Sequence, residues 1–102
     1  MLGVSRGMAI EFAPDGVRAN AVLPGAVDTA MLRDGLSREH VSGASVEERL
    51  DDLASRTVIR RVGTPEEIAT AVYFLADSAQ SSFMTGQPLI VDGGATTRLS
   101  TE

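Results

Sequence analysis

The run VRANAVLPG, residues 17–25, has the pattern of a β-strand that ends abruptly. Apolar residues alternate with Arg18 and Asn20, which is the period of two expected when one face of a strand is buried. The Pro-Gly pair at 24–25 cannot continue the ladder. The run therefore predicts a strand over residues 17–23. We expect Asn20 to bond at the strand end and Arg18 to contact solvent or a second subunit.

The residues before this strand predict a helix over 1–13. Val4, Met8 and Phe12 recur every fourth residue and form one apolar stripe. The sequence Ala-Pro-Asp-Gly at 13–16 ends the helix, because proline cannot continue it and Asp-Gly favours a turn. We expect the stripe to be the buried side of this helix.

Two glycines interrupt the same helix on a neighbouring face. Gly3 and Gly7 each cost up to about 1 kcal/mol relative to alanine. Close packing of another element against that face would offset the cost, and we expect such a contact. No capping residue precedes Gly3, so we interpret the helix as one that continues from residues upstream of Met1.

Two helix starts follow the first strand. Asp28 or Thr29 can cap a short helix that runs through Leu36. Ser45 opens the capping box Ser-Val-Glu-Glu, in which the serine hydroxyl accepts the amide three residues on. Apolar residues then recur at helical spacing, which predicts a helix over 46–56 with an acidic exposed side.

The clearest helix start in the chain is Thr64-Pro65, which places a hydroxyl at the N-cap and proline at the first helical position. The predicted helix covers 65–76, with a buried stripe of Ile68, Val72 and Leu75. A polar turn is expected over 77–82. Residues 88–92 then form a short strand that is apolar on both faces, as in a buried parallel strand.

The order of these elements predicts an α/β fold. Helices fill residues 24–87 between the two strands, which suits a parallel crossover. A sheet of only two parallel strands would leave exposed edges, which globular proteins avoid. We therefore expect the chain to form one end of a larger α/β sheet and to be incomplete as a stand-alone domain.

Composition excludes several classes of protein. The 102 residues include no cysteine and no lysine, so disulfides, thiol chemistry and lysine-assisted proton transfer cannot come from this chain. The net charge of −5 argues against nucleic acid and anionic membranes as partners. No apolar run approaches the roughly 20 residues that span a bilayer, and no signal peptide is evident. We expect a cytoplasmic protein without a metal site, because the acidic pairs suit helix starts and solvated faces.

Three segments together resemble the C-terminal half of the classical short-chain dehydrogenases/reductases. They are AIEFAPDGVRANAVLPG at 9–25, RVGTPEEIA at 61–69 and TGQPLIVDGG at 85–94, in the family's order. The resemblance implies that residues 1–102 are a C-terminal segment of a single Rossmann-like domain: two parallel strands plus helices at one end of the sheet.

The resemblance also implies a cofactor loop after the first strand. The family pattern of proline, glycine, an aliphatic residue and threonine falls on Pro24, Gly25, Val27 and Thr29. In the family, backbone near Val27 and the Thr29 hydroxyl would bind the carboxamide or adjacent phosphate of NAD or NADP. Ligands of open α/β sheets lie outside the carboxyl ends of strands, which agrees with this placement.

Other parts of the family's active site have no counterpart in the chain. The glycine-rich phosphate turn is absent, and so is the Tyr-x-x-x-Lys pair that handles the proton. Tyr73 lies in a different motif. The resemblance places the missing pair immediately before Met1. We therefore assign no catalytic residue here, and expect the isolated chain to be inactive and not to bind the cofactor alone.

The implied activity is hydride transfer between a nicotinamide and a small-molecule alcohol or ketone, as in 3-oxoacyl reductases or alcohol and sugar dehydrogenases. Residues 30–57 correspond to the family's substrate-covering segment. A homo-oligomer is expected, with Phe74, Phe83 and Leu89 either at its interface or in the core. The alternative is a non-catalytic remnant or an oligomerisation module.

Overall fold

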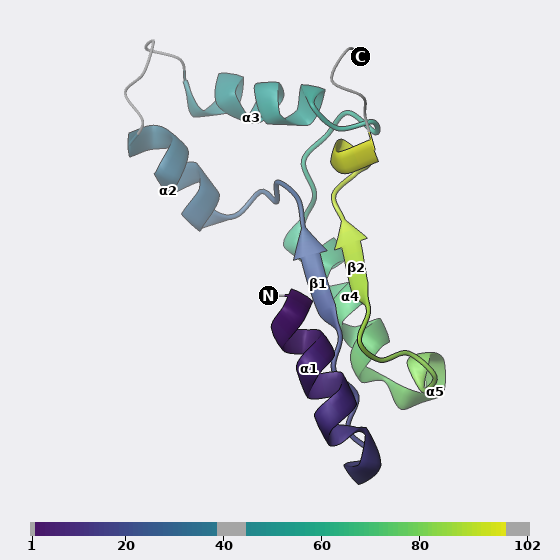
Figure 1. Ribbon diagram of the computed structural model, residues 1–102. Coiled ribbons are helices and arrows are strands. Elements are labelled where there is room, and N and C mark those ends of the chain that lie inside the picture. The colour runs from purple at the N-terminus through teal and green to yellow at the C-terminus, as the bar shows by residue number, and fades with distance from the viewer. Residues whose placement is uncertain (1, 39–44, 98–102) are drawn as a thin grey trace. The chain divides into compact units, whose positions relative to one another are not determined.

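The computed structural model describes residues 2–38 and 45–97, so the interpretation of Met1 and of the middle of segment 30–57 lies outside the described residues (Figure 1). The elements in chain order are α1 (Leu2–Phe12), η1 (Ala13–Asp15), β1 (Ala21–Pro24), α2 (Ala30–Arg38), α3 (Val46–Ser55), α4 (Pro65–Ala76), α5 (Ser78–Ser81), β2 (Pro88–Val91) and η2 (Ala95–Thr97). The chain forms two compact units, residues 1–23 with 69–91 and residues 24–68 with 92–102.

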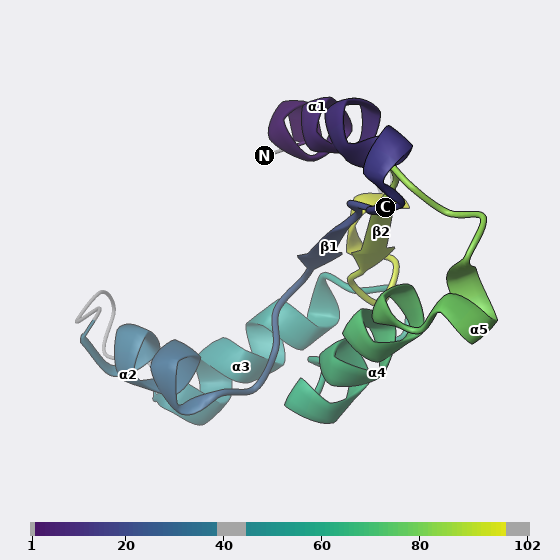
Figure 2. The ribbon, with the colours of Figure 1, turned by 90° about the horizontal axis from the view of Figure 1, so that it is seen from below.

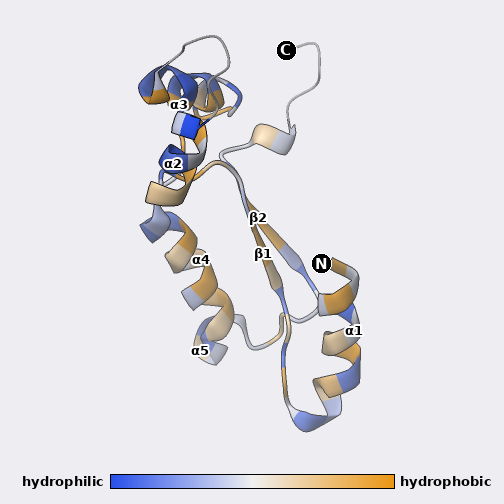
Figure 3. Ribbon diagram, turned by 90° about the vertical axis from the view of Figure 1, so that its left-hand side faces the viewer, coloured by the Kyte–Doolittle hydropathy of each residue, from blue (hydrophilic) through white to orange (hydrophobic). Residues whose placement is uncertain are grey.

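The first unit is a small α/β sandwich. Strands β1 and β2 pair in parallel, and Ala21 donates its amide to the Gln87 carbonyl at 3.0 Å (Figure 1). Helix α1 lies on one face of the strand pair, and residues 69–76 of α4 lie on the other (Figures 2 and 3). The predicted α/β class with two parallel strands and flanking helices is confirmed.

The first strand is shorter than predicted, because side-chain hydrogen bonds replace strand pairing in its upstream half. The Arg18 guanidinium donates from Nη1 to the carbonyls of Ser81 (2.9 Å) and Met84 (3.1 Å) and from Nη2 to that of Leu75 (2.9 Å). These bonds lie within one unit, so the expected solvent or subunit contact of Arg18 is wrong. The strand is Ala21–Pro24 rather than 17–23.

Asn20 completes this anchoring at the strand end, as predicted. Its side-chain amide donates to the Met84 carbonyl at 3.1 Å, and its Oδ1 accepts the Gln87 amide at 3.0 Å. The side chain thus meets two backbone groups of the segment that leads into β2, which fixes where pairing between the strands begins.

Helix α1 packs differently from the prediction. Among the described residues nothing lies within 4 Å of a Cβ built on Gly3 or Gly7, so the expected close contact there is wrong. The predicted stripe is exposed, and Ala9 is the one buried residue of α1. Ala9 lies against Gly86, where a built Cβ would be 3.4 Å from the Ala9 Cβ. A two-stranded sheet is too narrow to cover the larger side chains.

Helix α4 begins and ends where predicted, but its stripe is only partly covered. Leu75 is buried, whereas the side chain of Val72 is half exposed. The expected polar turn at 77–82 is instead the short helix α5, because the Asp77 carboxylate accepts the Ala79 amide at 3.0 Å and caps it. In β2, Ile90 is 53% exposed, so the prediction of a strand buried on both faces is wrong.

The second unit contains α2, α3 and the first turn of α4. Ser45 caps α3 by accepting the Glu48 amide at 3.1 Å, as the capping box predicts. Leu50 is the buried residue of α3, and its acidic side is exposed. In neither unit do the described residues include a helix long and apolar enough to cross a membrane.

Candidate functional site

The segment that follows β1 approaches Asp92 very closely at Gly25. A Cβ built on Gly25 would lie 2.8 Å from the Asp92 Cβ and 2.9 Å from its Cα. Real Cβ atoms do not approach backbone at that distance, so a side chain here would push the two segments apart. The close approach therefore requires glycine at this position. Because glycine has no side chain, the backbone after Pro24 is not covered by one.

Two residues further on, the segment pairs briefly with the loop before α4. Val27 and Gly63 form a parallel bridge, in which Gly63 donates to the Ala26 carbonyl and accepts from the Asp28 amide, both at 2.9 Å. In a parallel bridge these bonds use the neighbours of Val27, so its own amide and carbonyl point away from Gly63. The bridge fixes Val27 and leaves its backbone groups directed to the opposite side.

Thr29 begins α2 as its N-cap. Its Oγ1 accepts the Leu32 amide at 3.1 Å, and its carbonyl accepts the Arg33 amide at 3.0 Å. Because a hydroxyl carries one hydrogen and the cap uses an oxygen lone pair, that hydrogen remains available for an acceptor outside the helix. Of the two caps that the sequence allowed, Asp28 and Thr29, the structure uses Thr29.

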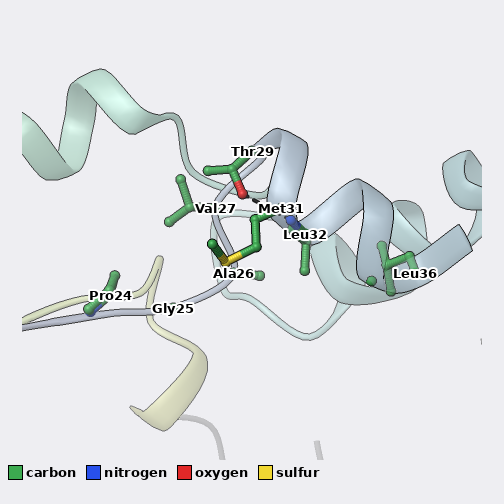
Figure 4. A pocket seen from close by; sticks show the side chains of 9 residues that line it. Pro24, Gly25, Ala26, Val27, Thr29, Met31, Leu32 and Leu36 are labelled. Carbon is green, nitrogen blue, oxygen red and sulfur yellow. Dashed lines mark hydrogen bonds between the residues drawn. The ribbon is translucent and has the colours of Figure 1, made fainter. Parts of the chain in front are cut away.

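These residues border a groove of about 450 Å³ in the second unit (Figure 4). Its lining is apolar, and Thr29 contributes its only side chain with an oxygen or nitrogen atom. The lining residues are Pro24, Gly25, Ala26, Val27, Thr29, Met31, Leu32, Gly35 and Leu36. A second hollow of about 300 Å³ is lined by Pro24, Val27, Thr29, Pro65 and Ile68. All four residues of the predicted cofactor loop thus line the larger hollow, and three of them also line the smaller one.

An ion-pair cluster lies beside the groove. Arg33 donates from Nε to Asp28 Oδ1 (2.7 Å), from Nη2 to Asp28 Oδ2 (2.9 Å) and from Nη1 to Glu47 Oε1 (2.7 Å). The hydrogen bond from Arg33 lowers the pKa of the Asp28 carboxyl below its usual value. Sequence reasoning missed this cluster, since partners five and fourteen residues apart match no helical pairing rule.

A second arginine holds the other side of the bridge. Arg61 makes a two-pronged pair with Glu67, with both N···O distances at 2.7 Å. Glu67 also accepts the backbone amide of Thr64 at 3.0 Å, while the Thr64 hydroxyl accepts the Glu67 amide at 3.3 Å. The Arg61 bond, followed by the Thr64 amide, lowers the pKa of Glu67 to about 2. The Thr64 start signal predicted the cap, but nothing in the sequence identified Arg61.

Other candidates contribute nothing to this loop. Tyr73 lies on α4 in the first unit and is 67% exposed. Over residues 2–38 and 45–97, no three His, Cys, Asp or Glu side chains are grouped so that they could hold a metal ion. What the loop offers a ligand is one hydroxyl donor, the backbone groups of Val27 and an apolar wall. That set suits a flat, partly apolar ring with a polar substituent, such as the nicotinamide end of a dinucleotide.

A parallel α/β sheet whose strand ends in such a loop is typical of Rossmann-like dinucleotide-binding domains. The family described as enoyl-(acyl carrier protein) reductase matches residues 1–96, nearly the whole chain. Together with the relatives below, this match shows that the chain belongs to the short-chain dehydrogenase/reductase family.

Two curated relatives illustrate the match. A tropinone reductase homolog of Arabidopsis thaliana is 44% identical over 93 residues, which are 91% of this chain and 31% of that protein. The 3-oxoacyl-[acyl-carrier-protein] reductase FabG of Chlamydia muridarum is 41% identical over 97 residues, 92% of this chain and 34% of that protein. The chain thus spans about a third of the length of the curated relatives it matches.

Solved structures also match nearly the whole of this chain but only part of their own length. Ligand-free aldohexose dehydrogenase of Thermoplasma acidophilum superposes with a TM-score of 0.87 at 35% identity, over 97% of this chain and 38% of that one. The structure of ElxO with NADP bound superposes with a TM-score of 0.75 at 32% identity, over 95% and 36%. The fold described above is therefore about two-fifths of these Rossmann-like structures.

Proposed function

We propose that the chain is the C-terminal part of an NAD(P)-dependent oxidoreductase, which moves a hydride between the nicotinamide and a carbon of a small alcohol or ketone. The observation that carries the proposal is the 24–29 loop: an apolar groove with one hydroxyl donor, on Thr29, beside the outward backbone of Val27. The NADP-bound relative and the reductases among the relatives support the assignment.

Each loop residue has a defined part in this proposal. The nicotinamide supplies the hydride-carrying carbon when it is bound. The Thr29 hydroxyl donates to the carboxamide or to a neighbouring phosphate oxygen, and the Val27 backbone pairs with the carboxamide. Pro24 and the backbone at Gly25 line the groove beside the place proposed for the ring. The loop binds and orients the cofactor, and moves no proton.

The substrate is covered by residues 30–57, of which α2 and α3 are described. The groove side of α2 carries Met31, Leu32 and Leu36, so an apolar wall borders the place proposed for the substrate. We expect a 3-oxoacyl compound or a simple alcohol or sugar as the substrate, and the cytoplasm as the site of action. The similarity to FabG and to aldohexose dehydrogenase supports these substrate classes.

The proton-handling Tyr-x-x-x-Lys pair of the family is not in this chain, which has no lysine. Asp28 is the titratable side chain of the loop, and it is paired with Arg33, so we do not expect it to take the place of that pair. The isolated 102-residue chain is therefore expected neither to turn over NAD(P)H nor to hold the cofactor tightly.

A graft tests the proposal. Residues 1–96 replace the matching segment of Thermoplasma acidophilum aldohexose dehydrogenase, which supplies the remaining part of the domain. The chimera should fold and oxidise or reduce a substrate with NAD(P)(H), while the isolated chain stays inactive in the same assay. A chimera that melts cooperatively but binds no nicotinamide cofactor would contradict the proposed function.

Assembly is a second proposed role, favoured by the exposed apolar side chains of the first unit. Phe83 is fully exposed, and Tyr73 and Ile90 are more than half exposed. Exposed apolar side chains mark an interaction surface where they form a contiguous patch. A homo-oligomer that covers them would appear as a sharp species in light scattering, and Phe83→Ser would weaken it. A stable monomer at high concentration would exclude this role.

A further inference from the structure

Arg33 is the most heavily engaged charged side chain at the edge of the groove. Its guanidinium uses all three of its nitrogen atoms, two toward Asp28 and one toward Glu47, at 2.7 to 2.9 Å. Asp28 precedes α2, Arg33 lies within it and Glu47 lies in the first turn of α3. One side chain thus ties the loop to both helices of the segment that follows.

Asp28 is placed so that its ion pair with Arg33 restricts the conformation of the loop. It stands between Val27 and Thr29, the two residues through which the loop would hold a cofactor. Its amide donates to the Gly63 carbonyl at 2.9 Å, so its backbone is fixed by the bridge and its side chain by Arg33. With both ends held, the peptide on either side of Asp28 has little freedom to turn.

We propose that Arg33 is a positioning residue for the 24–29 loop and acts through the Asp28 carboxylate. This inference rests on the proposed function, because the loop matters only if it holds a ligand there. The fork of the guanidinium fits the two carboxylate oxygens, which fixes direction as well as distance.

The charge of Arg33 has a second consequence. Asp28 and Glu47 are both carboxylates beside the start of α2, and Arg33 is the cation that bridges them. Without Arg33, Asp28 on the loop and Glu47 on α3 would leave two unbalanced negative charges next to a site for a cofactor that itself bears phosphates. Arg33 therefore lowers the repulsion that an anionic ligand would meet.

The pair Arg56–Asp52 supplies a matched control in the same unit. It is also an arginine–aspartate contact, at 2.8 Å, but it has one bond, lies at the end of α3 and is 68% and 59% exposed. It touches neither Asp28 nor the bridge. A substitution there removes one surface ion pair of the same chemistry without changing any contact of the 24–29 loop.

NMR on the full 102-residue chain tests, without any cofactor, whether the ion pair between Arg33 and Asp28 holds the loop. In Arg33→Gln and Asp28→Asn, the amides of Asp28 and Leu32 should exchange with solvent about fivefold faster, the scale of an exposed but well-formed ion pair. Arg56→Gln should leave both amides unchanged. The Arg33 Nε–Hε signal should lose its protection in Asp28→Asn and keep it in Glu47→Gln, because Nε donates to Asp28 alone.

The functional half uses the chimera described above. Arg33→Gln should raise the KM for NAD(P)(H) about fivefold with kcat within twofold, and Arg33→Lys should restore only part of that loss because an ammonium cannot form the fork. Unchanged exchange at both amides, or an unchanged KM in an active chimera, would overturn the inference. An inactive parent chimera would count against the proposed function alone, since the NMR result stands by itself. Should Arg33→Gln unfold the chain, Asp28→Asn gives the same decision.

Discussion

Arginine side chains stabilise each of the two units, but they bond to different kinds of acceptor. In the first unit, Arg18 donates to three neutral backbone carbonyls. In the second, Arg33 and Arg61 pair with carboxylates around the candidate cofactor loop. Bonds to carbonyls do not titrate, whereas pairs with carboxylates weaken in acid and in salt. The comparison teaches that the candidate cofactor loop is surrounded by ion pairs that respond to pH and salt, whereas the bonds of Arg18 in the first unit do not depend on a carboxylate.

The largest loss of stability should come from replacing Arg18. Arg18→Ala removes one charged donor from each of the carbonyls of Leu75, Ser81 and Met84, and we expect a loss of about 3 kcal/mol in unfolding free energy. Urea unfolding followed by circular dichroism measures it. Arg18→Lys should recover part of the loss because it keeps one donor. A loss below that of Arg56→Ala would show that the anchor does not hold the first unit.

The next effect concerns the close approach in the second unit. Gly25→Ala forces a methyl group against the Asp92 backbone, and we expect it to cost about 2 kcal/mol. Gly35→Ala is the matched control, because nothing lies within 4 Å of a Cβ there and α2 should gain up to about 1 kcal/mol. Equal effects of the two substitutions in thermal melts would mean that the contact between Gly25 and Asp92 is not formed.

Acid should weaken the pairing of Glu67 in the second unit. The folded pKa of Glu67 is about 2, below the ordinary value of 4.5, so its pairing stabilises the fold above pH 4.5 and the benefit is lost as the pH falls from there toward 2. The chain should therefore lose stability over that window, and Glu67→Gln should flatten the profile. Glu11→Gln, on α1, is the control. Parallel profiles for the parent and Glu67→Gln would contradict the pairing.

The smallest effect should be a gain in the first unit. Gly7→Ala adds a methyl group where nothing lies within 4 Å, so α1 should be stabilised by roughly 0.5–1 kcal/mol. Differential scanning calorimetry would detect the higher Tm. A lower Tm would restore the original expectation of a close contact on that face of the helix.

The sequence predicted what depends on neighbouring residues. The caps at Ser45 and Thr64 and the stop at Pro24 were identified from local chemistry, since a hydroxyl or a proline acts within one turn. The family resemblance, confirmed by the comparisons, selected the loop residues, and the structure brings them to one groove. The assignment of that loop to a cofactor stays a prediction.

What the sequence could not predict depends on partners far along the chain. Arg18 reaches carbonyls 57 to 66 residues away and so shortens the strand that alternation alone would extend. The close approach at Gly25 needs Asp92, and the pairing of Arg33 needs Glu47 on another helix. The exposed stripe of α1 was mispredicted because periodicity reports which face is apolar, not whether anything covers it.

The central claim is that Thr29 donates a hydrogen bond to a nicotinamide cofactor from the 24–29 loop. The most direct measurement is the KM for NAD(P)(H) of the chimera carrying Thr29→Val or Thr29→Ser, with the melting temperature checked because Thr29 also caps α2. One lost neutral hydrogen bond of about 1 kcal/mol corresponds to roughly a fivefold rise in KM for Thr29→Val, with Thr29→Ser close to the parent. Equal KM values for all three folded chimeras would contradict the claim.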